Sequence, residues 1–122
     1  MKYLAPSFLA LIAAVLLAAS AAAVDNNTLG FYFDTAAESN CLETAPFVTV
    51  PLHLLLLEPG ADVIRGYEFS YEVTGSHMIL STTLAGETPI DAGGGGGNHV
   101  VGLGAPLRVS SQTVLTTLAV FV

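Results

Sequence analysis

Three histidines, one cysteine and ten carboxylates are the side chains in this sequence that are best suited to catalysis or metal binding. The histidines, His53, His77 and His99, lack the spacing of a compact metal site, and Cys41 is far from all three in sequence. No catalytic-cysteine signature surrounds Cys41. We therefore expect Cys41 to be a free thiol buried in the domain, or to form a disulfide with a cysteine outside this segment.

Acidic residues offer the stronger case for a ligand site. Asp34, Glu38 and Glu43 surround one expected loop, and Glu58 and Asp62 flank another. Extracellular β domains can stabilise loops with calcium, which takes about six to eight oxygen ligands. The chain has no Asp-x-Asp-x-Asp spacing, so these five residues are weak calcium candidates, and we expect no other cofactor or metal. Paired carboxylates for glycoside hydrolysis would need a deep cleft, for which a domain of this size has little room.

Two further features resemble ligand sites but have a simpler structural explanation. Residues 93–97 are all glycine, yet Asn98 and His99 follow them where a phosphate loop requires Lys and then Ser or Thr. We expect a flexible hairpin connection there. Tyr67 and Tyr71 alternate with serine and glutamate, so they should face the core and not form a sugar-stacking platform.

Short strands separated by Gly, Pro and Asn must position these side chains. Residues 64–73 have the clearest pattern, because aromatic residues alternate with Glu68, Ser70 and Glu72, as in a half-buried antiparallel strand. Pro51 places its own strand at a sheet edge or at a bulge, whereas the leucines at 54–57 indicate burial on both faces. Residues 85–98 should form a loop, and Ala105 and Pro106 should end the strand before them. The expected strands span residues 29–34, 47–57, 64–73, 77–84, 99–103 and 109–122, the last being one strand or a pair.

This pattern predicts an all-β fold in which residues 24–122 form an antiparallel β-sandwich of six or seven strands, of jelly-roll or immunoglobulin-like kind. The apolar run at 114–122 continues to the last residue of the sequence. Either this strand closes the domain, or the domain is truncated at its C-terminal end. Truncation would leave an open sheet edge that could pair with another chain.

Residues 1–23 have the features of a signal peptide. Lys2 precedes an apolar stretch, and small residues form A-x-A patterns that end at Ala21 and Ala23. We expect cleavage after Ala23, with an uncleaved membrane anchor as the alternative. Cleavage leaves ten acidic residues and two arginines, a net charge of −8, and no integral membrane span. Because of the signal peptide, we expect a periplasmic, extracellular or cell-surface protein. Its acidic surface repels nucleic-acid phosphates, so we expect no binding to nucleic acid.

Several segments resemble a group of uncharacterised bacterial secreted proteins, namely residues 27–34, Cys41, residues 45–47, a leucine-rich strand that ends at Glu58 and Pro59, and residues 65–68 and 101–106. The resemblance implies secretion but no established activity. Those proteins often have a cysteine at the position of Phe69, which implies that Cys41 lacks that partner here, and they tend to continue beyond the position of Val122. Residues 48–52 and 64–69 are also similar to the opening strands of cohesin-like sandwiches, which implies a fold and not a ligand.

These observations predict a non-catalytic secreted or cell-surface module with a structural, adhesive or protein-binding role. A partner protein would be bound through an exposed strand edge. The alternative is a small extracellular calcium-dependent ligand-binding protein or hydrolase that uses the loop carboxylates.

Overall fold

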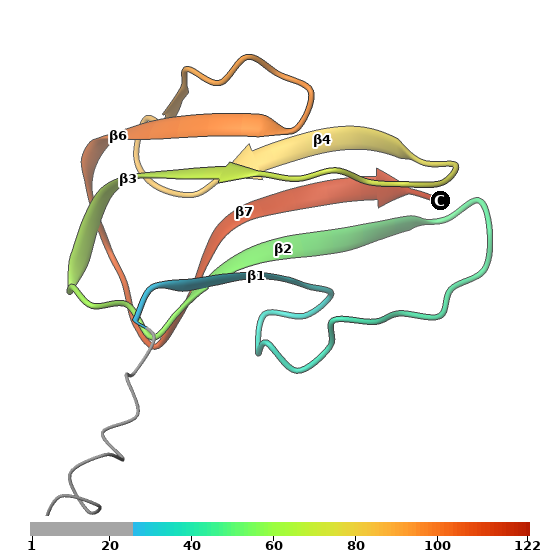
Figure 1. The fold of residues 1–122 in the computed structure, drawn as a ribbon, viewed down its shortest axis with the longest axis horizontal. Coiled ribbons are helices and arrows are strands. Elements are labelled where there is room, and N and C mark those ends of the chain that lie inside the picture. The colour runs from blue at the N-terminus through green and yellow to red at the C-terminus, as the bar shows by residue number, and fades with distance from the viewer. Residues whose placement is uncertain (1–25) are drawn as a thin grey trace, which may run out of the picture.

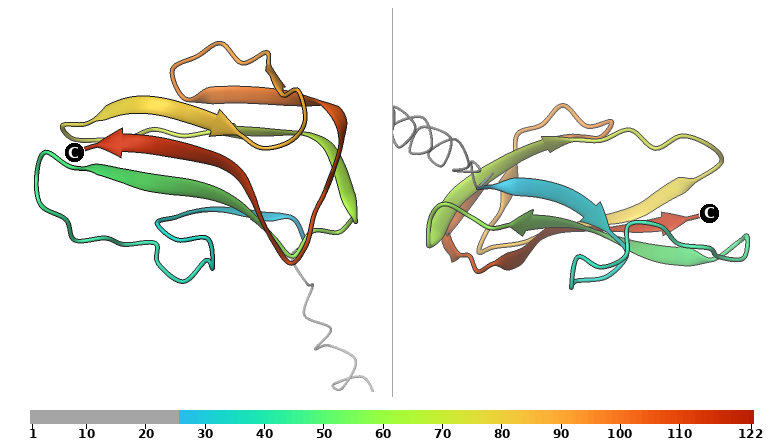
Figure 2. Two further views of the ribbon diagram at one scale, coloured as in Figure 1. Left: turned by 180° about the vertical axis from the view of Figure 1, so that it is seen from behind. Right: turned by 60° about the horizontal axis from the view of Figure 1, so that its bottom comes forward.

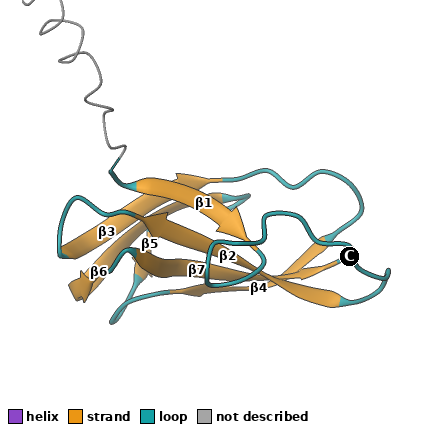
Figure 3. Cartoon of the chain, turned by 90° about the horizontal axis from the view of Figure 1, so that it is seen from below, coloured by secondary structure: helices purple, strands orange, loops and turns teal. Residues whose placement is uncertain are grey.

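The computed structural model describes residues 26–122, so the expected signal peptide lies outside the described residues. All regular structure in the described part is β-strand (Figure 3), and no helix there is long and apolar enough to cross a membrane. The strand count agrees with the expected six or seven. The strands are β1 (Thr28–Tyr32), β2 (Thr49–Leu57), β3 (Val63–Ser70), β4 (Met78–Leu84), β5 (Ile90–Asp91), β6 (Asn98–Arg108) and β7 (Gln112–Phe121).

The strands form two antiparallel sheets, one with the order β1-β2-β7-β4 and the other with the order β3-β6-β5. The chain passes from one sheet to the other after β2, β3, β4 and β6, as the views in Figures 1 and 2 show. This confirms the prediction of an all-β fold with two antiparallel sheets, in the arrangement of a β-sandwich.

The core lies between the sheets and draws on both of them. Leu54, Leu56 and Leu115 from the four-stranded sheet pack with Phe69 from the other sheet. A second cluster contains Val50, Leu118 and Val120. Because each fully buried leucine contributes about 1.5–3 kcal/mol relative to an exposed one, these residues hold the two sheets together.

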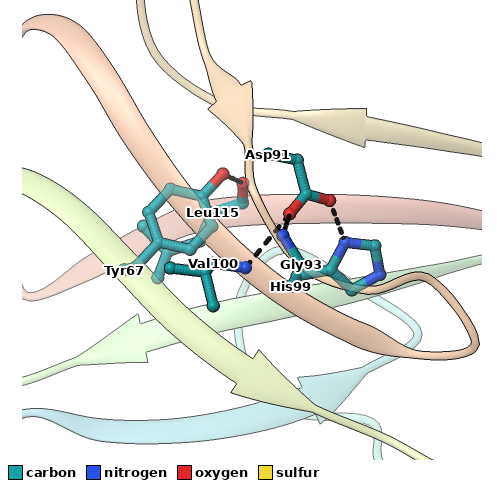
Figure 4. Close-up of polar contacts among 6 residues, drawn as sticks. All are labelled: Tyr67, Asp91, Gly93, His99, Val100 and Leu115. Atoms are coloured by element: carbon teal, nitrogen blue, oxygen red, sulfur yellow. Dashed lines mark hydrogen bonds and ion pairs between the residues drawn. The ribbon is translucent and has the colours of Figure 1, made fainter.

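The alternation in β3 orients its side chains as the sequence predicts. Phe69 is buried, Tyr67 and Tyr71 pack against the core, and Glu68 is exposed. The Tyr67 hydroxyl donates a hydrogen bond of 2.7 Å to the Leu115 carbonyl in the opposite sheet (Figure 4). Burial of this side chain raises the pKa of Tyr67. The tyrosines therefore help to join the sheets and do not form an exposed platform.

The prediction for Pro51 is wrong, because β2 is a central strand and its bulge lies at Leu54/Leu55. Pairing of β2 with β1 extends only as far as His53, so Pro51 lies past the end of β1. The Val122 amide donates to the Val48 carbonyl. The backbone N–H and C=O groups of every second residue from Val48 therefore point towards β7, and the backbone of Pro51 points away from it. The missing N–H of Pro51 therefore costs no ladder bond. The expected burial on both faces holds for the leucines at 54–56, which are all buried.

Two predictions about the segment from Ala85 to Arg108 are also wrong. Ala105 and Pro106 do not end a strand, because β6 continues through both of them to Arg108. Between Ile64 and Gly66 the partner of β3 shifts from Leu107 to Gly102, so residues 103–106 of β6 bulge out of this pairing and a proline is tolerated there. The expected loop at 85–98 contains the two-residue strand β5, which is too short to give a sequence pattern.

Candidate functional site

The three histidines lie in separate surroundings. The His53 ring is hydrogen-bonded through Nδ1 to Thr117 Oγ1 at 2.9 Å, and His77 is bonded through Nδ1 to the Gly75 carbonyl at 2.9 Å. His77 also lines a wide, open depression of about 880 Å³ together with Glu72. Within residues 26–122 no three His, Cys, Asp or Glu side chains are grouped so that they could hold a metal ion.

The five calcium candidates are likewise spread over the surface. Asp34 accepts hydrogen bonds from the backbone amides of Ala36, Glu38 and Ser39 at 2.7, 3.2 and 2.5 Å. The Glu38 amide is the largest cause of the lowered pKa of Asp34. This carboxylate therefore stabilises the turn after β1, and the side chains of Glu38, Glu43, Glu58 and Asp62 are exposed.

Cys41 is exposed and free within this chain. The expectation of a buried thiol is therefore wrong, while a disulfide with a cysteine outside this segment stays a prediction. It lies in the long connection between β1 and β2, which runs along the outside of the molecule (Figure 1). Ser39 Oγ donates to the Cys41 carbonyl at 3.0 Å, which fixes the backbone at this position.

The most specific polar cluster joins Asp91 in β5 to His99 in β6 (Figure 4). Asp91 Oδ2 lies 2.6 Å from His99 Nδ1, while Oδ1 accepts hydrogen bonds from the Gly93 and Val100 amides at 2.9 and 3.1 Å. The Gly93 amide is the largest cause of the lowered pKa of Asp91, followed by the His99 hydrogen bond. The His99 ring stacks on Phe69, with ring centroids 4.6 Å apart.

This Asp–His pair was missed from the sequence, because β5 was expected to be loop and Asp91 carries no motif. An Asp–His pair activates a nucleophile only when the histidine also hydrogen-bonds a hydroxyl or thiol. Within the described residues the bond to Asp91 is the sole hydrogen bond of the His99 ring. Through these contacts the pair joins the start of the glycine connection at 93–97 to β6 and to Phe69.

We expect Asp91→Asn to destabilise the protein most at neutral pH, because the substitution removes the charge from three hydrogen bonds. The folded-state pKa of Asp91 lies below its ordinary value of 3.8. The carboxylate therefore stabilises the fold above pH of about 4, and this stabilisation is lost as the pH falls through the folded-state pKa. Urea unfolding at several pH values measures the difference between the wild type and the variant.

The difference in the free energy of unfolding between the wild type and Asp91→Asn should be largest at neutral pH. It should shrink as the pH falls below the ordinary carboxyl pKa. Glu87→Gln is the control, since the described residues show no hydrogen bond to the exposed Glu87 side chain. A difference for Asp91→Asn that stays constant over the whole pH range would contradict this interpretation.

One long side of the sandwich, between β1 and β3, is open. β1 has only β2 as a neighbour, and β3 has only β6. A cleft of about 210 Å³ lies between the two strands, and we call it the β1–β3 cleft. Its walls include Leu29 from β1 and Ile64, Tyr67 and Glu68 from β3. Leu56 and Leu115, which are only 5% and 1% exposed, also line it, so the cleft gives access to the core.

The opposite side of the sandwich is covered by the connection between β4 and β5. The Ala85 amide donates to the Leu115 carbonyl at 2.8 Å, and the Gly104 amide donates to the Glu87 carbonyl at 3.0 Å. Near the β1–β3 cleft, the turn after β2 is fixed by a bond of 2.9 Å from the Asn27 amide to the Glu58 carbonyl. This bond holds Asn27, which lines the cleft, against the turn.

No protein-family model, curated protein or solved structure matches this chain.

Proposed function

We propose that this protein is an exported, non-catalytic β-sandwich module that binds another protein through an exposed strand edge. Export is supported by the apolar leader at 1–23 with its A-x-A ending. The observation that carries the binding role is the β1–β3 cleft, where the edge strands of the two sheets flank an opening towards the buried core residues Leu56 and Leu115. Proteins usually protect such edges, so an open one beside an apolar cleft is suited to accept a partner.

The fold that we propose in finer detail is a jelly-roll or cohesin-like sandwich. The chain crosses from one sheet to the other four times. These crossings support the proposal, because a sandwich made of hairpins within each sheet would have fewer of them. The similarity of residues 48–52 and 64–69 to cohesin-like strands agrees with this proposal. So does the resemblance to secreted bacterial proteins without an established activity.

A non-catalytic role is supported by the chemistry of the polar groups. His99 is engaged by Asp91 and stacked on Phe69, which suits a structural role better than proton transfer. The acidic charge of the chain, with Arg65 and Arg108 as the only cations after Lys2, disfavours nucleic acid and anionic membrane surfaces as partners.

We expect calcium to leave the thermal stability of the exported protein unchanged. Asp34 already accepts three backbone hydrogen bonds, and the other four candidate carboxylates are exposed. A ligand that binds the folded state raises the melting temperature as its concentration rises. Thermal unfolding in EDTA and in increasing calcium measures this effect. A calcium-dependent rise of several degrees would favour the alternative function that uses loop carboxylates.

The proposed function is tested by panning a phage-displayed random peptide library against the purified protein. An unrelated β-sandwich of similar size and acidity serves as the control target. We expect peptides with alternating apolar and polar residues to be enriched on this protein alone, because such peptides form strands. Recovery of no peptide beyond those that bind the control would contradict a protein-binding role.

A further inference from the structure

We propose that the β1–β3 cleft binds one kind of occupant: an extended segment of another protein that adds to the edge of β3. This segment would present apolar side chains to the cleft and lysine or arginine side chains to the outer face of the sheet. The inference rests on the proposed function and adds to it the edge, the orientation and the chemistry of the partner.

The backbone of β3 provides hydrogen-bonding groups for such a strand. The Tyr71 amide donates to the Gly97 carbonyl at 3.0 Å, so Tyr71 directs its backbone groups towards the β6 side. In an antiparallel ladder this direction alternates, and the N–H and C=O groups of Gly66, Glu68 and Ser70 therefore face the open side. An added strand would pair with these three residues.

The side chains beside this edge favour apolar residues on one face of the added strand. Ile64 and Tyr67 line the cleft from β3, and Leu29, which is 42% exposed, lines it from β1. The cleft also reaches the core residues Leu56 and Leu115. Apolar side chains at every second position of the added strand would cover this surface and remove it from water.

The charges on the outer face favour a basic partner. Glu68 in β3 and Glu72 just after it lie at outward-facing positions, and both side chains are exposed. The nearest cation in sequence, Arg65, lines a separate depression on the outer face of the same sheet with Ile90 and Gly102, towards β5. Opposite charges on facing residues of neighbouring strands stabilise pairing, whereas like charges destabilise it.

The same charges disfavour a second copy of this chain as the occupant. In an antiparallel pair, the side chains of two residues that face each other lie on the same face of the sheet. Glu68 would therefore lie beside an outward-facing side chain of the second copy's β3. From Gly66 onwards those residues are Gly66, Ser70 and the acidic Glu68 and Glu72, and the outward-facing Arg65 before them lies in the depression on the β5 side. The partner is therefore better described as a basic strand of a different protein.

The test is fluorescence anisotropy with a labelled nine-residue peptide in which valine and lysine alternate. We expect it to bind the exported protein, and we expect Glu68→Lys to weaken binding by about threefold to tenfold through the loss of cross-strand charge pairing. Glu87→Lys is the matched control, because Glu87 is equally charged and exposed but lies in the β4–β5 connection. Replacing the peptide's lysines with glutamate should abolish binding.

Backbone pairing is tested separately with a peptide that is N-methylated at alternate residues, so that one edge cannot donate hydrogen bonds. Methylation of the edge that faces β3 should abolish binding, while methylation of the other edge should not. Equal binding of both methylated peptides, equal effects of Glu68→Lys and Glu87→Lys, or no binding at all would overturn the inference. A protein dimer that Glu68→Lys dissociates would also overturn it, in favour of a second copy.

The failure of this inference can be distinguished from the failure of the proposed function. Peptides enriched by panning that do not compete with the valine–lysine peptide would leave the protein-binding role intact and place the binding site elsewhere. Failure of both panning and the designed peptide would reject both proposals.

Discussion

Leu118→Ala should lower the free energy of unfolding by about 2–5 kcal/mol, the range for removing a large side chain from a close-packed core. Leu118 is 0% exposed and packs in one cluster with Val50 and Val120. It lies on β7, opposite Leu52 of β2 and Thr82 of β4, so no surface rearrangement can fill the space that it leaves.

The measurement is urea unfolding of the purified protein, followed by circular dichroism. Leu80→Ala is the matched control, because Leu80 is 52% exposed and should cost less than about 1 kcal/mol. Equal losses for the two leucines would contradict the packing of β7 at the centre of its sheet.

Gly97→Ala should destabilise the protein by about 2–4 kcal/mol, because it combines a strained backbone with a steric clash. Gly97 has φ of +91°, in the left-handed region that favours glycine. A Cβ atom at this position would collide with the Tyr71 carbonyl oxygen, which belongs to the backbone next to β3. Relief of the collision would also break the hydrogen bond from the Tyr71 amide to the Gly97 carbonyl.

The neighbouring glycine provides a control that separates the two effects. Gly96 also has positive φ, at +64°, but a Cβ atom there would meet nothing within 4 Å. Gly96→Ala should therefore cost only the backbone term of about 1–2 kcal/mol. Thermal unfolding should show that Gly97→Ala is less stable than Gly96→Ala. Equal stability of the two variants would contradict the contact with Tyr71.

The sequence was sufficient to predict the parts of the fold that depend on local side-chain patterns. The alternation of Tyr67, Phe69 and Tyr71 with polar residues decides which face of β3 is buried, since neighbouring side chains in a strand point to opposite faces. The leucines at 54–56 indicated burial on both faces of β2 for the same reason.

The two proline errors arose because a proline's effect depends on its neighbours in the sheet. Pro51 is compatible with a central strand because β1 ends before reaching it, and Pro106 is compatible with β6 because β6 bulges out of its pairing with β3 there. Neither the length of β1 nor the bulge in β6 can be read from the residues around the prolines.

The candidate sites depend on contacts between residues that are distant in sequence, and this is why sequence patterns did not reveal them. Asp91 meets His99 only because the glycine connection folds β5 back onto β6. The β1–β3 cleft brings together Leu29, Leu56 and Leu115 from three different strands. The open edge considered in the sequence analysis depended on a missing strand after 114–122, whereas the strands beside the cleft, β1 and β3, could be identified as edge strands only from the sheet order.

Amide hydrogen exchange with and without the valine–lysine peptide tests strand addition to β3 most directly, because it reports on each backbone N–H separately. The amides of Gly66, Glu68 and Ser70 should become protected when the peptide binds, while those of Tyr67 and Phe69, which already face β6, should not change. Protection that appears in β4 or β5 instead, or unchanged exchange along β3 with the peptide bound, would contradict the account.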